Sequence, residues 1–152
     1  PKEGSYFLEL KTDGADSYTT ASQNLIMSAG DVVDGWAAFD YGDYGAYNDN
    51  AYVRILSGAT EIIKPWYRQG DDFPDYWDGP WEHWSWTATM NGAYTLEFRI
   101  SNDGDATNDS YALFDANIHT PAVPEPSTII LVGAGLLGLI GRSRKLRLLF
   151  KR

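Results

Sequence analysis

The sequence lacks cysteine altogether and contains only two histidines among its 152 residues. Without cysteine, disulfide bonds and thiol chemistry are excluded, so a folded domain must be held by its apolar core or by bound metal. The histidines, His83 and His119, lie too far apart in the sequence to indicate a zinc-binding pair. Six tryptophans, ten tyrosines and six phenylalanines supply ample apolar area for a core.

Positive charge is scarce over most of the chain. Residues 1–123 carry six Lys and Arg against twenty Asp and Glu, a net charge of −14, whereas residues 128–152 carry six bases and no acid. This acidity excludes nucleic acid as a partner, because phosphates require a positive surface. It suits bound cations, neutral ligands or solubility outside the cell.

The sequence also lacks the motifs of common enzymes. It has no nucleophile motif, no Gly-rich phosphate loop and no metalloprotease helix. Asp75 and Asp78 are close enough in sequence to be considered as a glycosidase pair, but neighbouring acids in an aspartate-rich segment are poor evidence for one. The sequence therefore predicts a protein that is not an enzyme.

Helical periodicity is missing before residue 128, and alternation of apolar and polar residues takes its place. Asn91-Gly92 and Ser57-Gly58 each predict a β-hairpin. About eight short strands at this spacing predict a two-sheet β-sandwich. The clearest alternation is Tyr94, Leu96, Phe98 and Ile100, and further strands are expected over residues 6–11, 22–28, 35–41, 51–56, 60–66, 83–90 and 110–118.

The C-terminal segment has a different composition. An unbroken apolar run covers residues 129–140, no charge falls between Glu125 and Arg142, and six bases follow. A helix over residues 127–141 would span roughly 22 Å, which is short for a bilayer core of ~30 Å. A polar motif, an apolar stretch and a basic tail form the layout of a C-terminal sorting signal whose bases stay in the cytoplasm. A buried C-terminal helix is the alternative.

The stretch VPEPST at 123–128, followed by Gly/Leu-rich residues and then bases, closely resembles the PEP-CTERM sorting signal of Gram-negative bacteria. Pro124, Glu125 and Pro126 match its name-giving motif. The resemblance implies export, recognition by a membrane-embedded exosortase, and association with extracellular polysaccharide and biofilm. It also implies transient anchoring in the inner membrane through residues 128–141, with the C-terminus cytoplasmic. Because the sequence starts at Pro1 without a signal peptide, we expect a truncated or processed N-terminus.

The upstream region is similar to jelly-roll domains of the galactose-binding, carbohydrate-binding-module type, through the stretches EGSYFLEL, GAYTLEFRISN and SYALFDANI. The expected fold class is therefore all-β. A jelly-roll-like β-sandwich is expected over residues 1–119 and a Pro-rich linker over 120–127. A single short hydrophobic helix with a basic tail is expected over 128–152.

Oxygen-bearing side chains crowd residues 40–50, between two expected strands. Hard oxygen ligands in a Gly-containing loop suit calcium, and a solvated turn is the alternative. A second acidic segment, residues 103–109, departs from an EF-hand loop and is interpreted as a hairpin loop. The jelly-roll resemblance implies that Asp115 is a structural calcium ligand. The candidate ligands for Ca²⁺ are Asp40, Asp43, Asn48, Asp49, Asn50 and Asp115.

Residues 66–86 interleave eight aromatic side chains with four aspartates. Exposed Trp and Tyr beside carboxylates bind sugars, because the rings stack on the apolar sugar face and the acids accept hydroxyl hydrogens. A long loop folded onto its own aromatics is the alternative, and alternation places Trp84 and Trp86 in the core. The candidate ligand-binding residues are Trp66, Tyr76, Trp77, Trp81, Asp75 and Asp78.

Together these patterns predict an exported, non-enzymatic cell-surface or extracellular-matrix protein that binds glycan or exopolysaccharide. The alternative is a purely structural or adhesive matrix protein that assembles by self-association and is stabilised by calcium.

Overall fold

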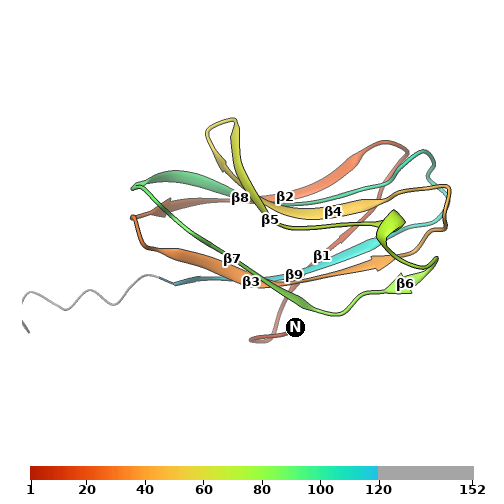
Figure 1. The fold of residues 1–152 in the computed structure, drawn as a ribbon, viewed down its shortest axis with the longest axis horizontal. Coiled ribbons are helices and arrows are strands. Elements are labelled where there is room, and N and C mark those ends of the chain that lie inside the picture. The colour runs from red at the N-terminus through yellow and green to blue at the C-terminus, as the bar shows by residue number, and fades with distance from the viewer. Residues whose placement is uncertain (120–152) are drawn as a thin grey trace, which may run out of the picture. The chain divides into compact units, whose positions relative to one another are not determined.

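The structure is a computed structural model that describes residues 1–119, which form two antiparallel sheets stacked as a sandwich (Figure 1). The predicted all-β sandwich is therefore confirmed. The expected linker, PEP motif and hydrophobic helix fall at 120–152, outside the described residues. Among the residues described, no helix has the length and apolar character needed to cross a membrane.

The chain crosses repeatedly between the two sheets, although β4 and β5 lie together in the second sheet and β6 and β7 together in the first. In the first sheet, β9 lies between β1 and β3, and β3 pairs on its other side with both β6 and β7. The second sheet has the order β2-β8-β4-β5, and one short 3-10 helix, η1, follows β5. The bounds are β1 Leu8–Lys11, β2 Tyr18–Met27, β3 Val32–Tyr41, β4 Asn50–Ser57, β5 Thr60–Gln69, η1 Gly70–Asp72, β6 Trp77–Asp78, β7 Glu82–Thr87, β8 Gly92–Ser101 and β9 Tyr111–His119.

The inner faces of the two sheets carry the alternating apolar residues that the sequence predicts. All four residues of the clearest alternation, on β8, are buried in one core cluster with Trp66 and Trp84. The rings of Phe98 and Phe114 meet between the sheets with centroids 4.8 Å apart. Such packing of aromatic side chains adds to the apolar burial that a disulfide-free domain needs.

One of the two predicted hairpins is wrong. Gly58, with φ of +58°, does join β4 to its neighbour β5. In contrast, the chain around Asn91-Gly92 crosses between the sheets, because β7 pairs with β3 and β8 pairs with β2 and β4. The Asn91 side chain instead accepts a hydrogen bond from the backbone N–H of Ala29 at 2.7 Å.

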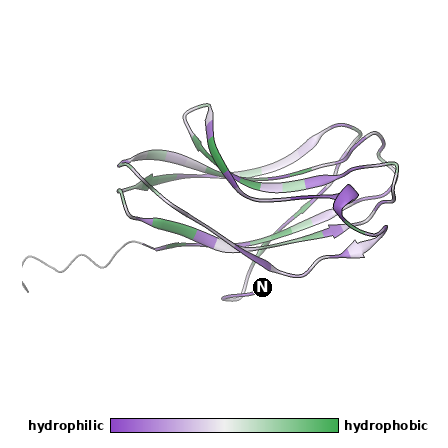
Figure 2. Cartoon of the chain, viewed as in Figure 1, coloured by the Kyte–Doolittle hydropathy of each residue, from purple (hydrophilic) through white to green (hydrophobic). Residues whose placement is uncertain are grey.

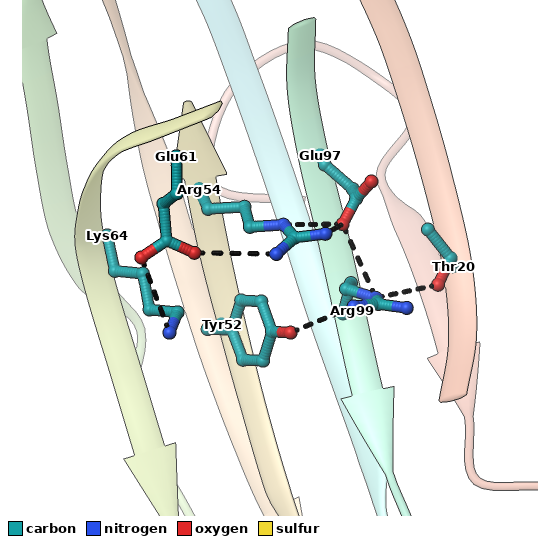
Figure 3. A network of polar contacts seen from close by, with 7 residues as sticks. All are labelled: Thr20, Tyr52, Arg54, Glu61, Lys64, Glu97 and Arg99. Atoms are coloured by element: carbon teal, nitrogen blue, oxygen red, sulfur yellow. Dashed lines mark hydrogen bonds and ion pairs between the residues drawn. The ribbon is translucent and has the colours of Figure 1, made fainter. Parts of the chain in front are cut away.

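A charged network covers the outer face of the second sheet (Figure 3). Arg54 on β4 lies 2.7 Å from Glu97 on β8 and 3.4 Å from Glu61 on β5. Arg99 on β8 extends the network to β2, where its Nε donates to the hydroxyl of Thr20 at 3.0 Å. The charges thus lie on β5, β4 and β8, and the contact with β2 is to a neutral hydroxyl.

Candidate functional site

Four loops meet at the end of the sandwich where β3 ends (Figure 1). They join β1 to β2, β3 to β4, β5 to β6 and β8 to β9. The hydrophilic η1 lies in the loop between β5 and β6 (Figure 2). Aspartate and asparagine side chains accept backbone N–H groups across these loops. Asp75 accepts from Gly45 at 2.9 Å, and Asn48 accepts from Asp71 at 2.9 Å. In addition, Asp103 accepts from the N–H of Asn48 at 3.2 Å. The acidic segments that are separate in sequence are therefore neighbours, and many of their acids cross-link loops.

Two carboxylates at this end are fully buried, Asp43 and Asp49, which we call the buried acid pair. Asp49 accepts from the Ser110 hydroxyl at 2.6 Å and from the N–H of Asp103 at 2.9 Å. Burial raises the pKa of the Asp49 carboxyl, and the charge of Asp43 acts in the same direction. Within residues 1–119, Oδ2 of Asp43 and both side-chain polar atoms of the buried Asn102 have no hydrogen-bond partner.

The six predicted calcium ligands do not come together. Asp40 lies on the outer face of the first sheet, Asn48 accepts an N–H in the loop, and Asn50 begins β4. Asp115 on β9 accepts the N–H groups of Lys2 and Glu3 at 2.9 and 2.7 Å, so it ties down the N-terminal segment. In the part of the chain described, no cluster of three or more His, Cys, Asp or Glu could hold a metal ion.

The buried acid pair has two unfavourable features that a bound cation would relieve. A buried oxygen without a partner costs free energy, and two adjacent buried carboxylates repel. Calcium accepts amide, backbone and water oxygens as well as carboxylates, so Asn102 and loop carbonyls would have to complete the ligand set.

A second feature is a cleft of about 210 Å³ on the outer face of the first sheet, which we call the tyrosine cleft. Asp40 on β3 stands directly opposite Asp78 on β6 and opposite Tyr111 on β9, and opposite residues in antiparallel strands share a face. Burial, and then the charge of Asp78, raises the pKa of the Asp40 carboxyl. The cleft is lined by Asp40, Tyr41, Gly42, Tyr76, Asp78, Asp109 and Tyr111.

Tyr76 lies on the wall of the tyrosine cleft in an unusual conformation. Its φ is +53°, in the left-handed region that favours glycine. Its N–H donates to the carbonyl of Asp43 at 3.0 Å, while the residue is 63% exposed. Strained backbone that presents a side chain to solvent often marks a functional position.

The other predicted aromatic ligands lie elsewhere. Trp66 is not in or beside the loop: it lies in β5, 5% exposed, with its indole N–H donating to Glu82 at 2.7 Å, so its ring offers no free face. Trp77 is stacked on Phe73 with centroids 3.9 Å apart. Trp81 contacts Phe7 edge to face at 6.0 Å. Trp84 is buried and Trp86 packs against the core, as alternation predicts.

The structure also shows residues that sequence reasoning missed. Tyr111 and Asp109 line the tyrosine cleft, and Lys11 pairs with Asp109 at 2.6 Å beside it. His83 and His119, distant in sequence, both face Asp34, with Nε2 to carboxylate distances of 3.3 and 3.0 Å. Only the pairing of β7 and β9 with β3 brings these groups together, so no local motif could have revealed them.

Two solved structures show a distant likeness to this chain. A carbohydrate-binding module, TmCBM61 in complex with β-1,4-galactotriose, is 15% identical, with a TM-score of 0.45 over 77% of this chain and 72% of that chain. The infectious bursal disease virus VP2 subviral particle is 16% identical, with a TM-score of 0.36 over 72% of this chain and 30% of that one. No curated protein matches the sequence.

The C-terminal segment, in contrast, matches a described family. Residues 122–145 match the family "PEP-CTERM protein-sorting motif", and this range contains Pro124, Glu125 and Pro126. Such a motif implies export, exosortase processing and a transient C-terminal membrane anchor. Residues 122–145 of this protein are therefore a PEP-CTERM sorting motif.

Proposed function

We propose that this protein is an exported, non-catalytic surface or matrix protein that binds a glycan in the tyrosine cleft. The observation that carries the proposal is Tyr76, whose strained backbone holds an exposed ring over a cleft of carboxylates. The faces of Tyr76 and Tyr111 suit the apolar face of a sugar, and carboxylate oxygens accept hydroxyl hydrogens. The cleft is smaller than the ~300–1,000 Å³ of typical small-molecule pockets, which favours a polymer bound at the surface.

The charges of the tyrosine cleft indicate the class of glycan. Asp40 and Asp78 face each other across paired strands, an arrangement that is destabilising for like charges. Asp109 adds a third carboxylate, which Lys11 partly neutralises. An anionic polysaccharide would increase this repulsion, so the ligand we propose is a neutral, hydroxyl-rich polysaccharide.

Replacing Tyr76 by alanine should weaken binding of a neutral polysaccharide at least about tenfold, a change of about 1.4 kcal/mol. The ring is exposed, so stability should change little, by about 0.5 kcal/mol or less. Affinity electrophoresis of the full chain in nonionic detergent, with a panel of neutral and anionic polysaccharides, measures this effect. Tyr6→Ala is the matched control, because Tyr6 is also exposed but does not line the tyrosine cleft. Equal loss of binding in the two variants, or wild-type binding of anionic polysaccharides alone, would contradict the proposal.

We expect an exosortase to cleave the chain near Pro124-Glu125-Pro126, because this motif precedes a short apolar run and a basic tail. Before cleavage, residues 128–141 would anchor the chain in the inner membrane with the bases in the cytoplasm. Intact-mass spectrometry of protein from cells that contain an exosortase should show a C-terminus close to the motif. Mature protein that still contains Arg152 would show that the motif is not processed.

A calcium-stabilised structural role is the second candidate function. The unpartnered Oδ2 of Asp43, fully buried next to Asp49, is the observation that favours it. Asp43 and Asp49, with the amide oxygen of Asn102, would hold the ion, which would neutralise the buried acid pair and fix the loops. The two functions are compatible, since Tyr76 donates its N–H to the carbonyl of Asp43 and so depends on the same loop.

A further inference from the structure

Sheet edges in this sandwich are not equally protected against pairing with another chain. Unpaired edges invite strand addition, and proteins block them with short strands, charges, proline or bulges. β5 carries Lys64, Pro65 and Arg68, and its pairing with β4 has register shifts. At the edges of the first sheet, β1 has four residues including two charges, β6 has two residues, and β7 contains Glu82 and His83.

β2 has none of these protecting features. It is ten residues long and carries no charged residue and no proline. Its pairing with β8 is continuous from Tyr18 to Met27 without a bulge, and among the described strands it pairs with β8 alone. Ile26 on this strand is 86% exposed, so its side chain is free to contact a second chain.

The neutrality of β2 matters because residues 1–119 carry the net charge of −14. Two copies of so acidic a domain repel at most surfaces. The charged network of the second sheet reaches β5, β4 and β8, whereas its contact on β2 is the hydroxyl of Thr20 (Figure 3). Two copies can therefore approach edge to edge along β2 without bringing charged side chains of that strand together.

β2 is also complementary to itself. Two antiparallel copies keep their inner faces on one side only if the two-fold axis passes midway between a residue and the same residue of the second copy. Ser22 and Gln23 lie at the strand centre and are the candidates for that position. If the axis lies at Ser22, Ile26 stands opposite Tyr18 of the second copy. If the axis lies at Gln23, Ile26 stands opposite Thr20 of the second copy. Either register covers Ile26, and neither contains a charged pair.

Space for the added strand is present at the same edge. A groove of about 380 Å³ opens beside Ala21, Ser22 and Gln23, with Phe7 and Phe98 among its lining residues. Inner-face side chains of a second β2 would lie over this groove.

We propose that β2 is a self-association edge, through which two copies pair antiparallel and join their second sheets into one eight-stranded sheet. This inference does not depend on glycan binding.

Single cysteines provide a direct test, because the chain has none of its own. The Cα atoms of directly opposite residues lie ~4.5–5.5 Å apart, within the range of a disulfide. Under mild oxidation of the full chain in nonionic detergent, Ser22→Cys or Gln23→Cys should give a covalent dimer, and the more efficient variant identifies the register. The control is Ile62→Cys, an exposed site on the protected edge β5, which should give no covalent dimer.

The double variant Ser22→Lys with Gln23→Lys should weaken dimerisation at least about tenfold in sedimentation velocity, because like charges then meet at the axis. Ile62→Lys with Ile63→Lys, on β5, is the matched control and should leave dimerisation unchanged. Any association through the C-terminal segment occurs equally in all variants, so it cannot cause a difference between them. A monomeric wild type, equal cross-linking of all three cysteine variants, or dimers that survive the β2 lysines would overturn the proposal.

Discussion

Replacing Trp66 by alanine should lower the free energy of unfolding by about 3–5 kcal/mol, the range for large-to-small changes at buried aromatic residues. Trp66 is buried between the sheets, and its ring meets Phe114 edge to face at 5.8 Å. Its indole N–H bonds Glu82, which also pairs with Arg68 at 2.6 Å, so the change also removes a polar link between β5 and β7. Urea denaturation followed by tryptophan fluorescence measures the loss.

Trp66→Phe is the matched control for this prediction. It keeps most of the apolar area and loses mainly the hydrogen bond, so it should cost about 1 kcal/mol for that bond plus a smaller packing cost. Tyr6→Ala, at an exposed position, should stay within about 0.5 kcal/mol of wild type. If Trp66→Ala unfolds at the same urea concentration as wild type, Trp66 does not occupy the core.

Calcium at 100 times its dissociation constant should raise the free energy of unfolding by about 2.7 kcal/mol, because it binds the folded state only. Thermal melts with calcium and with chelator measure this difference. Asp43→Asn should remove the calcium effect. In chelator it should not destabilise the protein, because it deletes a buried charge with an unpartnered oxygen. Identical wild-type melts under both conditions would leave the buried acid pair as a structural feature without a metal.

The pH dependence tests the same pair. The pKa of the Asp49 carboxyl is raised in the folded protein, so the folded state binds its proton more readily than the unfolded chain. The resulting contribution to stability is present at low pH and is lost as the pH rises through the raised pKa. In chelator, wild type should therefore gain stability relative to Asp49→Asn as the pH falls from neutral, and calcium should suppress this gain because protonation competes with the cation. If the stabilities of wild type and Asp49→Asn change with pH in parallel, the raised pKa of Asp49 does not contribute to stability.

The sequence predicts the strands well where alternation is strong and the turn is local. β8 and the β4–β5 hairpin follow from period-two burial and from Gly58. The hairpin predicted at Asn91-Gly92 is wrong, because β8 joins the opposite sheet and does not pair with β7, its neighbour in sequence. Turn residues indicate that the chain reverses direction, but they do not indicate which sheet the next strand joins.

The candidate site shows the same limit. Composition identified Tyr76, Asp78 and Asp40, but assigned them to two separate sites, and the pairing of β3 with β6 unites them. Trp66 was predicted to bind ligand because it ends the expected strand over residues 60–66, and an apolar strand residue beside a loop gives no sign of which face it occupies. The acids of residues 40–50 divide into surface, loop and buried positions through contacts with residues about 20–70 positions away, which spacing cannot encode.

The location of glycan binding tests the central claim most directly. In two-dimensional NMR spectra of the full chain in detergent micelles, a neutral oligosaccharide should shift the signals of Gly42, Tyr76, Asp78 and Tyr111 in a saturable way. Signals of Phe7 and Gln23, which line the groove beside β2, should stay unchanged. Shifts confined to Phe7 and Gln23, or no saturable shift with any neutral oligosaccharide, would contradict glycan binding in the tyrosine cleft.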